Sequence, residues 1–360
     1  MEDRGTALIA WTKACKPKDR GGLGILDLTI HNKCLLMKHV HKFLCKNDLP
    51  WVKLIWNTYY PNGYRPDRVV GSFWWKSIQK LIPEFKHMAN CNIGYGDTIQ
   101  LWKDDWGQGN LQQEFPHLFS FCLQPDITIN QWMAQEVPTD IFVTPMTIEA
   151  YQEYQLLMHI QDTIQIQDNP DTWRIGQSNN PCSVSKIYRA MFPQGYIHPI
   201  YKHIWDNGCV LKYKIFTWLM IQDRINTKNL LSRKSFNVQS IACVLCNYQI
   251  EETRLHLFWD CDFAQDCWDS ICSNRKRGIS TIDNYMLFLA HLDCPIAKEI
   301  IIMGLWHIWM QRNNVIFNNK RHSIAHSREL LKKDMILLAY RIKEKHKNYL
   351  HTWIDTHLTI

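Results

Sequence analysis

The feature that most constrains the fold of this chain is a string of four soft metal ligands between residues 243 and 261. Two residues separate Cys243 from Cys246, nine separate Cys246 from His256, and four separate His256 from Cys261. Three thiolates and one imidazole form a closed, tetrahedral zinc site, which leaves no coordination position for a reacting water. The string therefore predicts one structural zinc ion, held in a segment too small to fold alone. The nine-residue spacer is expected to form a hairpin or an extended loop.

Composition limits the class of protein. The chain has 360 residues, enough for two or three domains, and its 46% hydrophobic and 12% aromatic content excludes general disorder. Its thirteen cysteines are odd in number, and no apolar stretch follows the charged residues at the start of the chain. We therefore expect reduced thiols in an intracellular protein of the nucleus or cytoplasm, not a secreted one. Cys267 and Cys272 are alternative metal ligands, but their helical spacing favours core packing.

Charge and hydropathy patterns bear on the partners of the chain. The net charge of +7 is unevenly spread: residues 1–60 hold ten Lys/Arg against five Asp/Glu, and residues 201–240 hold seven against two. Such local excess suits a polyanion partner, and ordinary solvated helix faces are the alternative. The longest apolar run, residues 300–310, is about half of a bilayer span. It predicts a buried helix, and no membrane association is expected.

Hydrophobic periodicity predicts a mainly α chain with small β-hairpins, in which a zinc-stapled helical module is followed by a C-terminal helical tail. Residues 94–97 are expected to form a hairpin turn that feeds a strand at 98–102, and another short strand is expected near 173–176. The polar residues 161–169 are a candidate linker. Helices are expected over residues 30–44, 72–82, 148–158, 183 onward, 212–222, 227–234 and 262 onward.

The tail has an amphipathic pattern. Over residues 323–350 an apolar stripe runs beside a basic face. The stripe consists of Leu331, Met335, Leu338 and Ile342. Such a stripe is suited to pairing with a partner helix.

Several separated blocks of the sequence resemble one known family. Gly71-Ser-Phe-Trp-Trp75 and Trp102-x-Asp104-x-Trp106 precede the metal string, and Trp306-x2-Trp309-x2-Arg312-Asn313 follows it. Together with residues 11–38, 204–231 and 243–268, these blocks resemble the region after the polymerase in plant LINE-type (non-LTR) retrotransposon reverse transcriptase polyproteins. That region includes the reverse transcriptase zinc-binding domain. One departure is the stretch at residues 38–42, where many members of the family carry tryptophans.

The resemblance implies four segments and the absence of catalysis. Residues 1–135 correspond to a post-polymerase connector, 136–180 to a linker region, 181–275 to the reverse transcriptase zinc-binding domain, and 276–360 to a helical basic tail. Polymerase, endonuclease and ribonuclease H catalytic motifs are not found, so we expect a non-catalytic fragment of such a protein. Other domains of the same polyprotein are candidate partners.

One short motif imitates a catalytic site. Trp102-Lys103-Asp104-Asp105 fits the aromatic-x-Asp-Asp box of polymerases, in which paired carboxylates hold two magnesium ions. That chemistry needs a further carboxylate on a neighbouring strand, and the sequence offers no convincing one. The pair is therefore expected to cap a turn.

Basic residues near the metal string predict contacts to RNA or DNA. Lys and Arg side chains interleaved with aromatic residues are typical of nucleic-acid surfaces, and contacts to phosphates alone would bind without sequence specificity. Three alternatives remain: a structural or protein-interaction module that uses the tail stripe, a magnesium-dependent nuclease or polymerase, and a decayed product without an autonomous function. The candidate phosphate-binding residues are Lys13, Lys16, Lys18, Arg20, Arg224, Lys228, Arg233, Lys234, Arg275, Lys276 and Arg277.

Overall fold

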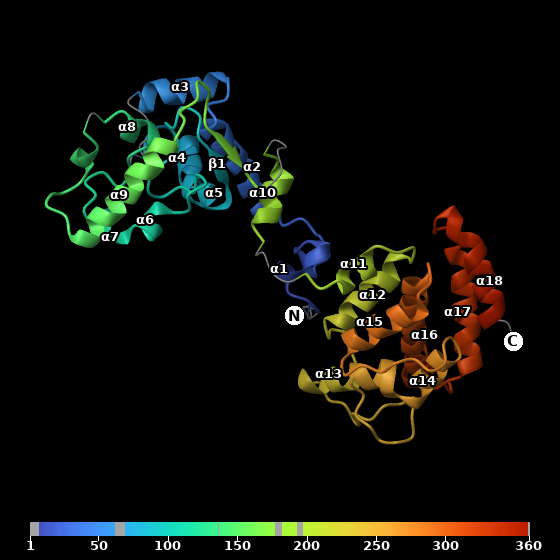
Figure 1. Cartoon of the computed structure of the whole chain (residues 1–360). Helices are drawn as coiled ribbons and strands as arrows, with labels where there is room; N and C mark the ends of the chain where they lie inside the picture. Colours follow the sequence, from blue (N-terminus) through green and yellow to red (C-terminus); the bar gives the residue numbers. More distant parts are fainter. Residues whose placement is uncertain (1–6, 62–68, 136, 177–181, 193–196, 359–360) are drawn as a thin grey trace, which may run out of the picture. The chain divides into compact units, whose positions relative to one another are not determined.

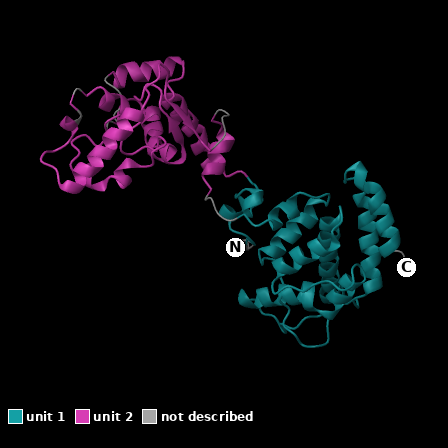
Figure 2. Cartoon of the chain, in the orientation of Figure 1, with its two compact units in different colours: residues 1–25, 195–360 teal, residues 26–194 magenta. Residues whose placement is uncertain are grey.

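The structure is a computed structural model that describes residues 7–61, 69–135, 137–176, 182–192 and 197–358 (Figure 1). The chain forms two compact units, which Figure 2 distinguishes: residues 1–25 and 195–360 make unit 1, and residues 26–194 make unit 2. The prediction of a mainly α fold is confirmed. The four segments expected from the family resemblance are a different division of the chain and stay a prediction.

Unit 2 is built from short helices around one longer helix, α2. The carboxylate of Asp27 accepts the backbone N–H groups of Thr29 and Ile30 and so begins α2, whose buried face includes Phe43 and Leu44. The elements of unit 2 are α2 (Leu28–Leu44), α3 (Pro50–Tyr59), α4 (Phe73–Gln79), α5 (Ile82–Met88), β1 (Asn90–Asn92), α6 (Leu111–Glu114), α7 (Pro116–Ser120), α8 (Ile129–Met133), η2 (Pro138–Ile141), α9 (Ile148–Thr163), β2 (Thr172–Arg174) and α10 (Val184–Ala190).

The β structure of unit 2 comes from distant segments. β1 and β2 pair antiparallel, with Cys91 opposite Trp173, which confirms the strand expected near Trp173. The helix expected to end before Pro83 instead ends at Gln79, and Pro83 lies in the first turn of α5, where its missing N–H costs nothing. Residue 100 forms only an isolated bridge with Thr128, so the strand expected at 98–102 is wrong.

A buried carboxylate organises the loop before that bridge. Asp171 is 1% exposed; one oxygen accepts the N–H groups of Gly94 and Gly96 at 2.8 and 2.7 Å, and the other accepts the N–H and hydroxyl of Thr98 at 2.9 and 2.7 Å. A Cβ on Gly94 would come within 2.1 Å of the Asn169 carbonyl oxygen. The chain therefore wraps around Asp171 instead of forming a hairpin turn. Residues 161–169 belong to unit 2.

Unit 1 surrounds the long helix α16, which is apolar around most of its circumference and is buried as such helices are (Figure 1). It contains the apolar run 300–310, as predicted. The elements of unit 1 are α1 (Trp11–Ala14), η1 (Lys18–Arg20), α11 (Ile200–Trp205), α12 (Leu211–Ile221), α13 (Lys228–Arg233), η3 (His256–Asp260), α14 (Asp262–Asp269), α15 (Thr281–Leu292), α16 (Ala297–Asn318), α17 (Ile324–Leu338), η4 (Glu344–His346) and α18 (Lys347–His357).

The tail packs inside unit 1. Leu331, Met335 and Leu338 on α17 are at most 3% exposed and belong to the same core as α16. The apolar stripe is therefore covered by this chain, so it is not available to a partner as the sequence suggested. Among the described residues, no helix is both long enough and apolar enough to cross a bilayer.

The N-terminal residues of unit 1 are held against α11 and α12. The indole N–H of Trp218 donates to the carbonyl oxygen of Gly21 at 2.9 Å. A Cβ on Gly22 would come within 1.9 Å of the Lys16 carbonyl oxygen, so this turn requires a glycine. The turn fixes the basic loop that begins near Lys13 on the surface of unit 1.

Candidate metal centre

The structure brings the four predicted metal ligands together. One donor atom from each of Cys243, Cys246, His256 and Cys261 lies within 4.8 Å of the others. The Sγ atoms of Cys243 and Cys261 are 3.9 Å apart, and the Cys246 Sγ is 3.3 Å from the Nε2 of His256. Zinc–sulfur bonds of about 2.3 Å in a tetrahedron place neighbouring donors roughly 3.8 Å apart. The cluster is therefore consistent with one zinc site.

A hairpin presents the first two cysteines. The N–H of Cys243 donates to the Ile250 carbonyl, and the N–H of Glu252 donates to the Ile241 carbonyl, both at 2.8 Å. These bonds flank the bridge between Ala242 and residue 251. The spacer between Cys246 and His256 therefore includes the returning arm of a hairpin, as predicted.

A turn of π-helix presents the other two ligands. It spans His256–Asp260, and the N–H of Cys261 donates to the His256 carbonyl oxygen at 2.7 Å. A π turn bonds residue i to residue i+5, so it brings His256 and Cys261 to the same side. Within the turn Phe258 is buried, and its carbonyl accepts the indole N–H of Trp268 at 2.8 Å. Packing of this turn into the core explains why an unusual helical form persists here.

The protonation states of the metal-binding side chains depend on whether a cation is bound. The hydrogen bond to Cys261 and then burial raise the pKa of the Cys243 thiol above its ordinary value, and burial raises the pKa of Cys246. Burial lowers the pKa of His256, which favours the neutral imidazole that binds metals. A bound divalent ion reverses the preference of the thiols, because it stabilises the thiolates.

Glu252 connects the hairpin to two helices. This carboxylate is fully buried; its Oε1 accepts the N–H of Lys228 at 2.9 Å and the Nη2 of Arg312 at 2.7 Å. The Nζ of Lys228 in turn donates to the Ala242 carbonyl, next to the first ligand. The hairpin, α13 and α16 therefore form one hydrogen-bonded assembly. Sequence analysis did not single out Glu252 as a site residue; it only included this residue in the stretch 243–268 that resembles the family.

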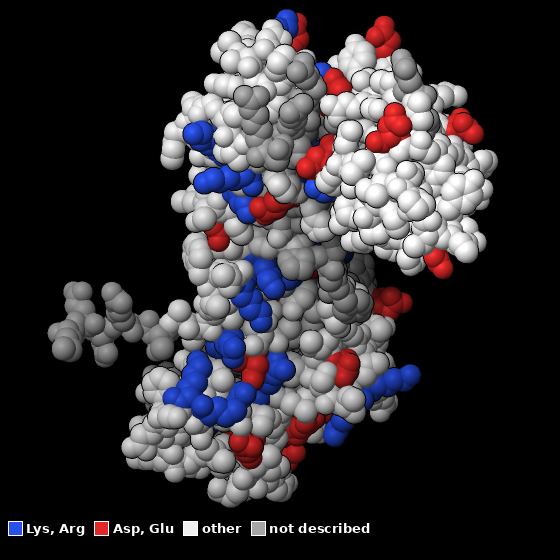
Figure 3. All heavy atoms as spheres, turned by 90° about the vertical axis from the view of Figure 1, so that its left-hand side faces the viewer, with Lys and Arg blue, Asp and Glu red and all other residues white. Residues whose placement is uncertain are grey.

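Three of the predicted basic residues interact through their charges. Burial, and then repulsion from Arg224 and Lys16, lower the pKa of Lys13. We call Lys13, Lys16 and Arg224 the basic triad. The ammonium of Lys18 lies over the ring of Trp205, 5.3 Å from its centroid. Figure 3 shows Lys and Arg side chains gathered in the lower half of the view, at the level of α13, with some Asp and Glu between them.

Other predicted basic residues have intramolecular partners. Arg233 is paired with Asp223 at 2.5 Å, and Arg277 donates to Gln265 at 2.5 Å. The side chain of Arg275 is 3% exposed and lies 3.7 Å from Asp269, so it is buried and not available at the surface. The remaining candidates are the exposed Lys234 and Lys276, the half-buried Arg20 and Lys228, whose Nζ holds the hairpin.

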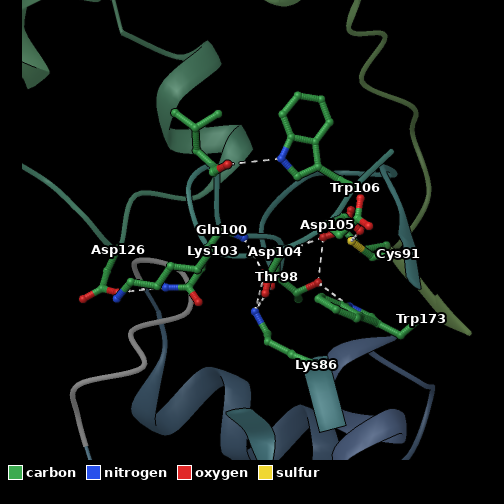
Figure 4. A network of polar contacts seen from close by, with 12 residues as sticks. Lys86, Cys91, Thr98, Gln100, Lys103, Asp104, Asp105, Trp106, Asp126 and Trp173 are labelled. Carbon is green, nitrogen blue, oxygen red and sulfur yellow. Dashed lines mark hydrogen bonds and ion pairs between the residues drawn. The ribbon is translucent and has the colours of Figure 1, made fainter. Parts of the chain in front are cut away.

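The polymerase-like motif forms a structural network in unit 2 (Figure 4). The carboxylate of Asp104 pairs with Lys86 at 2.6 Å and accepts the N–H of Gln100 at 2.8 Å, with both charged side chains buried. Asp105 accepts the N–H groups of the glycines at positions 107 and 109. Both carboxylates thus accept backbone N–H groups of turns, as expected, although the strand expected before them is not formed.

Comparison with known proteins agrees with this geometry. Residues 182–268, which include all four ligands, match a family model described as zinc-binding in reverse transcriptase. The "Putative ribonuclease H protein At1g65750" of Arabidopsis thaliana is 22% identical over 291 residues, which cover 77% of this chain and 46% of that protein. The chain thus spans about half the length of that relative. No solved structure matches the chain.

A second plant relative is shorter. The "Uncharacterized mitochondrial protein AtMg00310" of Arabidopsis thaliana is 31% identical over 107 residues, which cover 29% of this chain and 70% of that protein. An identity at this level over most of the relative shows common descent. The chain therefore belongs to the same family as this plant mitochondrial protein, and it contains a reverse-transcriptase-associated zinc-binding domain at residues 182–268.

Proposed function

We propose that the chain is a non-catalytic part of a LINE-type retrotransposon reverse transcriptase protein that binds one structural zinc ion and holds RNA or DNA without sequence specificity. The observation that carries this proposal is the Cys243, Cys246, His256 and Cys261 cluster, with donors within 4.8 Å of one another, inside residues that match a zinc-binding domain of reverse transcriptase. Zinc would occupy the cluster with all four positions filled by protein, which gives it a structural role.

The metal centre is connected by hydrogen bonds to the segment that carries part of the proposed binding surface. Glu252 and Lys228 join the metal-binding hairpin to the start of α13, and Arg224 lies just before that helix. A zinc ion that fixes the hairpin would therefore also fix the segment that carries Arg224. The basic triad is concentrated positive charge, which binds phosphates by releasing counterions from nucleic acid.

The polar network of unit 2 supports the absence of a catalytic role. A two-metal site needs carboxylates that are free to hold magnesium. Asp104 is instead neutralised by Lys86, and Asp105 is engaged by backbone N–H groups. Other domains of a reverse transcriptase polyprotein are the proposed protein partners of the chain.

The proposal is tested by binding of the zinc-loaded chain to labelled RNA and DNA over a salt series. We expect the logarithm of the affinity to fall linearly with the logarithm of salt concentration, with a slope of about −0.7 to −0.9 per phosphate contact. A Lys13→Ala/Lys16→Ala/Arg224→Ala variant should make the slope shallower by about 2 to 3, because three contacts are lost. Lys343→Ala/Lys345→Ala, which changes exposed lysines elsewhere in unit 1, is the control. Absence of binding at low salt by a folded, zinc-loaded chain would refute the proposal.

A further inference from the structure

A pocket of about 620 Å³ lies in unit 1, between α13, residues 237–240 and the C-terminal half of α16. Its volume is within the roughly 300–1,000 Å³ of ordinary ligand sites. We propose that this α13–α16 pocket receives one unstacked base of a single-stranded nucleic acid. The inference rests on the proposed function, and it assigns to the chain a site that distinguishes single strands from duplexes.

An exposed aromatic ring borders the pocket. Phe317, on the last turn of α16, is 72% exposed. Leu231 and Ile316 add apolar walls. Every base has a π face, and stacking of a base on an exposed aromatic side chain is the usual contact of single-strand-binding proteins. Phe317 is therefore placed as a stacking platform.

The rest of the lining is rich in amides. Asn226, Asn237, Gln239 and Asn313 line the pocket, and the Asn313 side chain is oriented by a 3.0 Å bond from Arg312 to its oxygen. An amide side chain offers donors and acceptors together, as does the edge of a nucleobase. Amides beside an aromatic ring suit a flat, polar-edged ligand better than an apolar peptide side chain, whose burial would leave several amides without partners.

Charge at the pocket favours an anionic ligand strand. Lys228 and Arg312 line it, and Lys320 and Arg321, which follow α16 directly, are exposed. The guanidinium of Arg312 lies 4.7 Å from the centroid of the Trp309 ring and is paired with the buried Glu252. Its charge is therefore already compensated, and Arg312 acts as part of the pocket wall. Since the Nζ of Lys228 is engaged by the Ala242 carbonyl, Lys320 and Arg321 remain as cations for the phosphates that flank a bound base.

Bases that are paired in a duplex cannot enter the pocket, because it is a recess in the protein surface. A base in a duplex is stacked on both faces and its pairing edge is occupied, so it cannot enter a recess in a protein without being extruded. Single strands expose the face and edge that the Phe317 ring and the amides would contact. The pocket therefore predicts a preference for single strands over duplexes, in addition to the general attraction of the basic triad.

The test compares Phe317→Ala with the wild-type chain, using a labelled oligouridylate, the matching oligothymidylate and a duplex of equal length. We expect about tenfold weaker binding of both single strands, because stacking contributes that order of affinity per base. Duplex binding and the salt slope should stay unchanged, and Phe317→Tyr, which keeps a ring, should restore the affinity. Tyr340→Ala is the matched control, because it removes another exposed ring, which is 84% exposed and follows the end of α17. Because Phe317 is exposed, unchanged thermal unfolding is expected in all variants.

Each other outcome overturns the inference in a distinguishable way. If the wild-type chain binds single strands and Phe317→Ala binds them equally well, the pocket is not a base site, whereas the proposed function stands. Equal weakening of single-strand and duplex binding would likewise remove the base-specific role. If the wild-type chain binds neither single strands nor duplex, the proposed function fails, and the pocket fails with it.

Discussion

The two units stabilise their irregular segments by different chemical means, a metal centre in one and a buried carboxylate in the other. Each unit contains a stretch without regular helices, residues 234–253 in unit 1 and residues 93–110 in unit 2, whose backbone groups need partners that a helix would supply internally. In unit 1 four soft ligands, all between residues 243 and 261, converge on a site that fits one metal ion. In unit 2 one carboxylate, Asp171, accepts four hydrogen bonds from a loop 73 to 77 positions away in the sequence.

The comparison shows what the metal centre and the Asp171 centre each require in order to form. A metal centre is local: a hairpin and one turn of π-helix suffice to assemble it, and the ion provides the energy. The Asp171 centre is non-local, so it forms only when the two distant segments have been brought together by the apolar core around them. Unit 1 should therefore respond to chelators and unit 2 to the loss of a single charge.

The largest effect should follow loss of the metal centre. Replacing Cys261 by Ser removes one ligand and with it most of the zinc affinity, so we expect unit 1 to lose on the order of 5 kcal/mol or more of unfolding free energy. Hydrogen exchange measured by mass spectrometry resolves the units: peptides from residues 241–261 should lose protection, whereas those from unit 2 should keep theirs. A chelator should reproduce the result in the wild-type chain.

Cys294→Ser is the control for this experiment, because it changes a half-buried thiol of unit 1 outside the metal centre. Equal protection in the Cys261→Ser, chelated and wild-type samples would show that the four residues pack without an ion, and would remove the contrast between the units.

A smaller but still large effect should follow a change at Asp171. Asp171→Asn keeps the shape of the side chain but turns one acceptor oxygen into a donor that faces other donors. At a site only 1% exposed, we expect a loss of about 3 kcal/mol in the stability of unit 2. The measurement is the exchange of peptides from residues 90–106 and 170–176, with unit 1 peptides unaffected.

Asp168→Asn tests whether the effect is specific, because Asp168 is an exposed carboxylate of the same unit. If Asp171→Asn and Asp168→Asn were equally harmless, the buried carboxylate would not be the organising group of unit 2.

The sequence predicted unit 1 better than unit 2 for a physical reason. Cys243, Cys246, His256 and Cys261 have few alternative roles at that spacing, and their distances in sequence are short, so the centre could be predicted before any tertiary structure was known. Glu252 was missed because a glutamate in a hairpin normally lies in solvent, and only the position of Arg312 sixty residues later explains its burial.

In unit 2 the same kind of reasoning failed where tertiary contacts override local preference. Glycines at positions 94 and 96 suggested a hairpin turn, but their N–H groups are oriented by Asp171, which no local pattern connects to them. Pro83 suggested the end of a helix, although a proline is equally suited to the first turn of the next one. Helix α2 was predicted from the period of its apolar residues and α16 from an unbroken apolar run, because each pattern is contained in the helix's own residues.

The smallest effect concerns pH and sharpens the comparison within unit 2. The Nε2–H of His41 donates to the carbonyl oxygen of Trp173 in β2 at 3.1 Å. Burial lowers the pKa of His41 below its ordinary value; that hydrogen bond opposes the shift, and the charges of Lys38 and Lys42 add to it. The imidazole is therefore neutral in the folded unit at a pH where the unfolded chain already binds a proton.

The sign of the pH effect follows from this difference. Stability is fully present above the unfolded pKa of about 6.5 and declines as the pH falls from there towards the folded pKa, because only the unfolded state gains protons in that interval. His41→Gln should make the stability of unit 2 less dependent on pH, whereas His159→Gln, at an exposed position of α9, should not. The measurement is unit 2 exchange protection at pH 7.5 and 5.5, corrected for intrinsic rates. The same pH dependence in wild type and His41→Gln would show that proton uptake at other groups controls unit 2, and would leave Asp171 as its main electrostatic determinant.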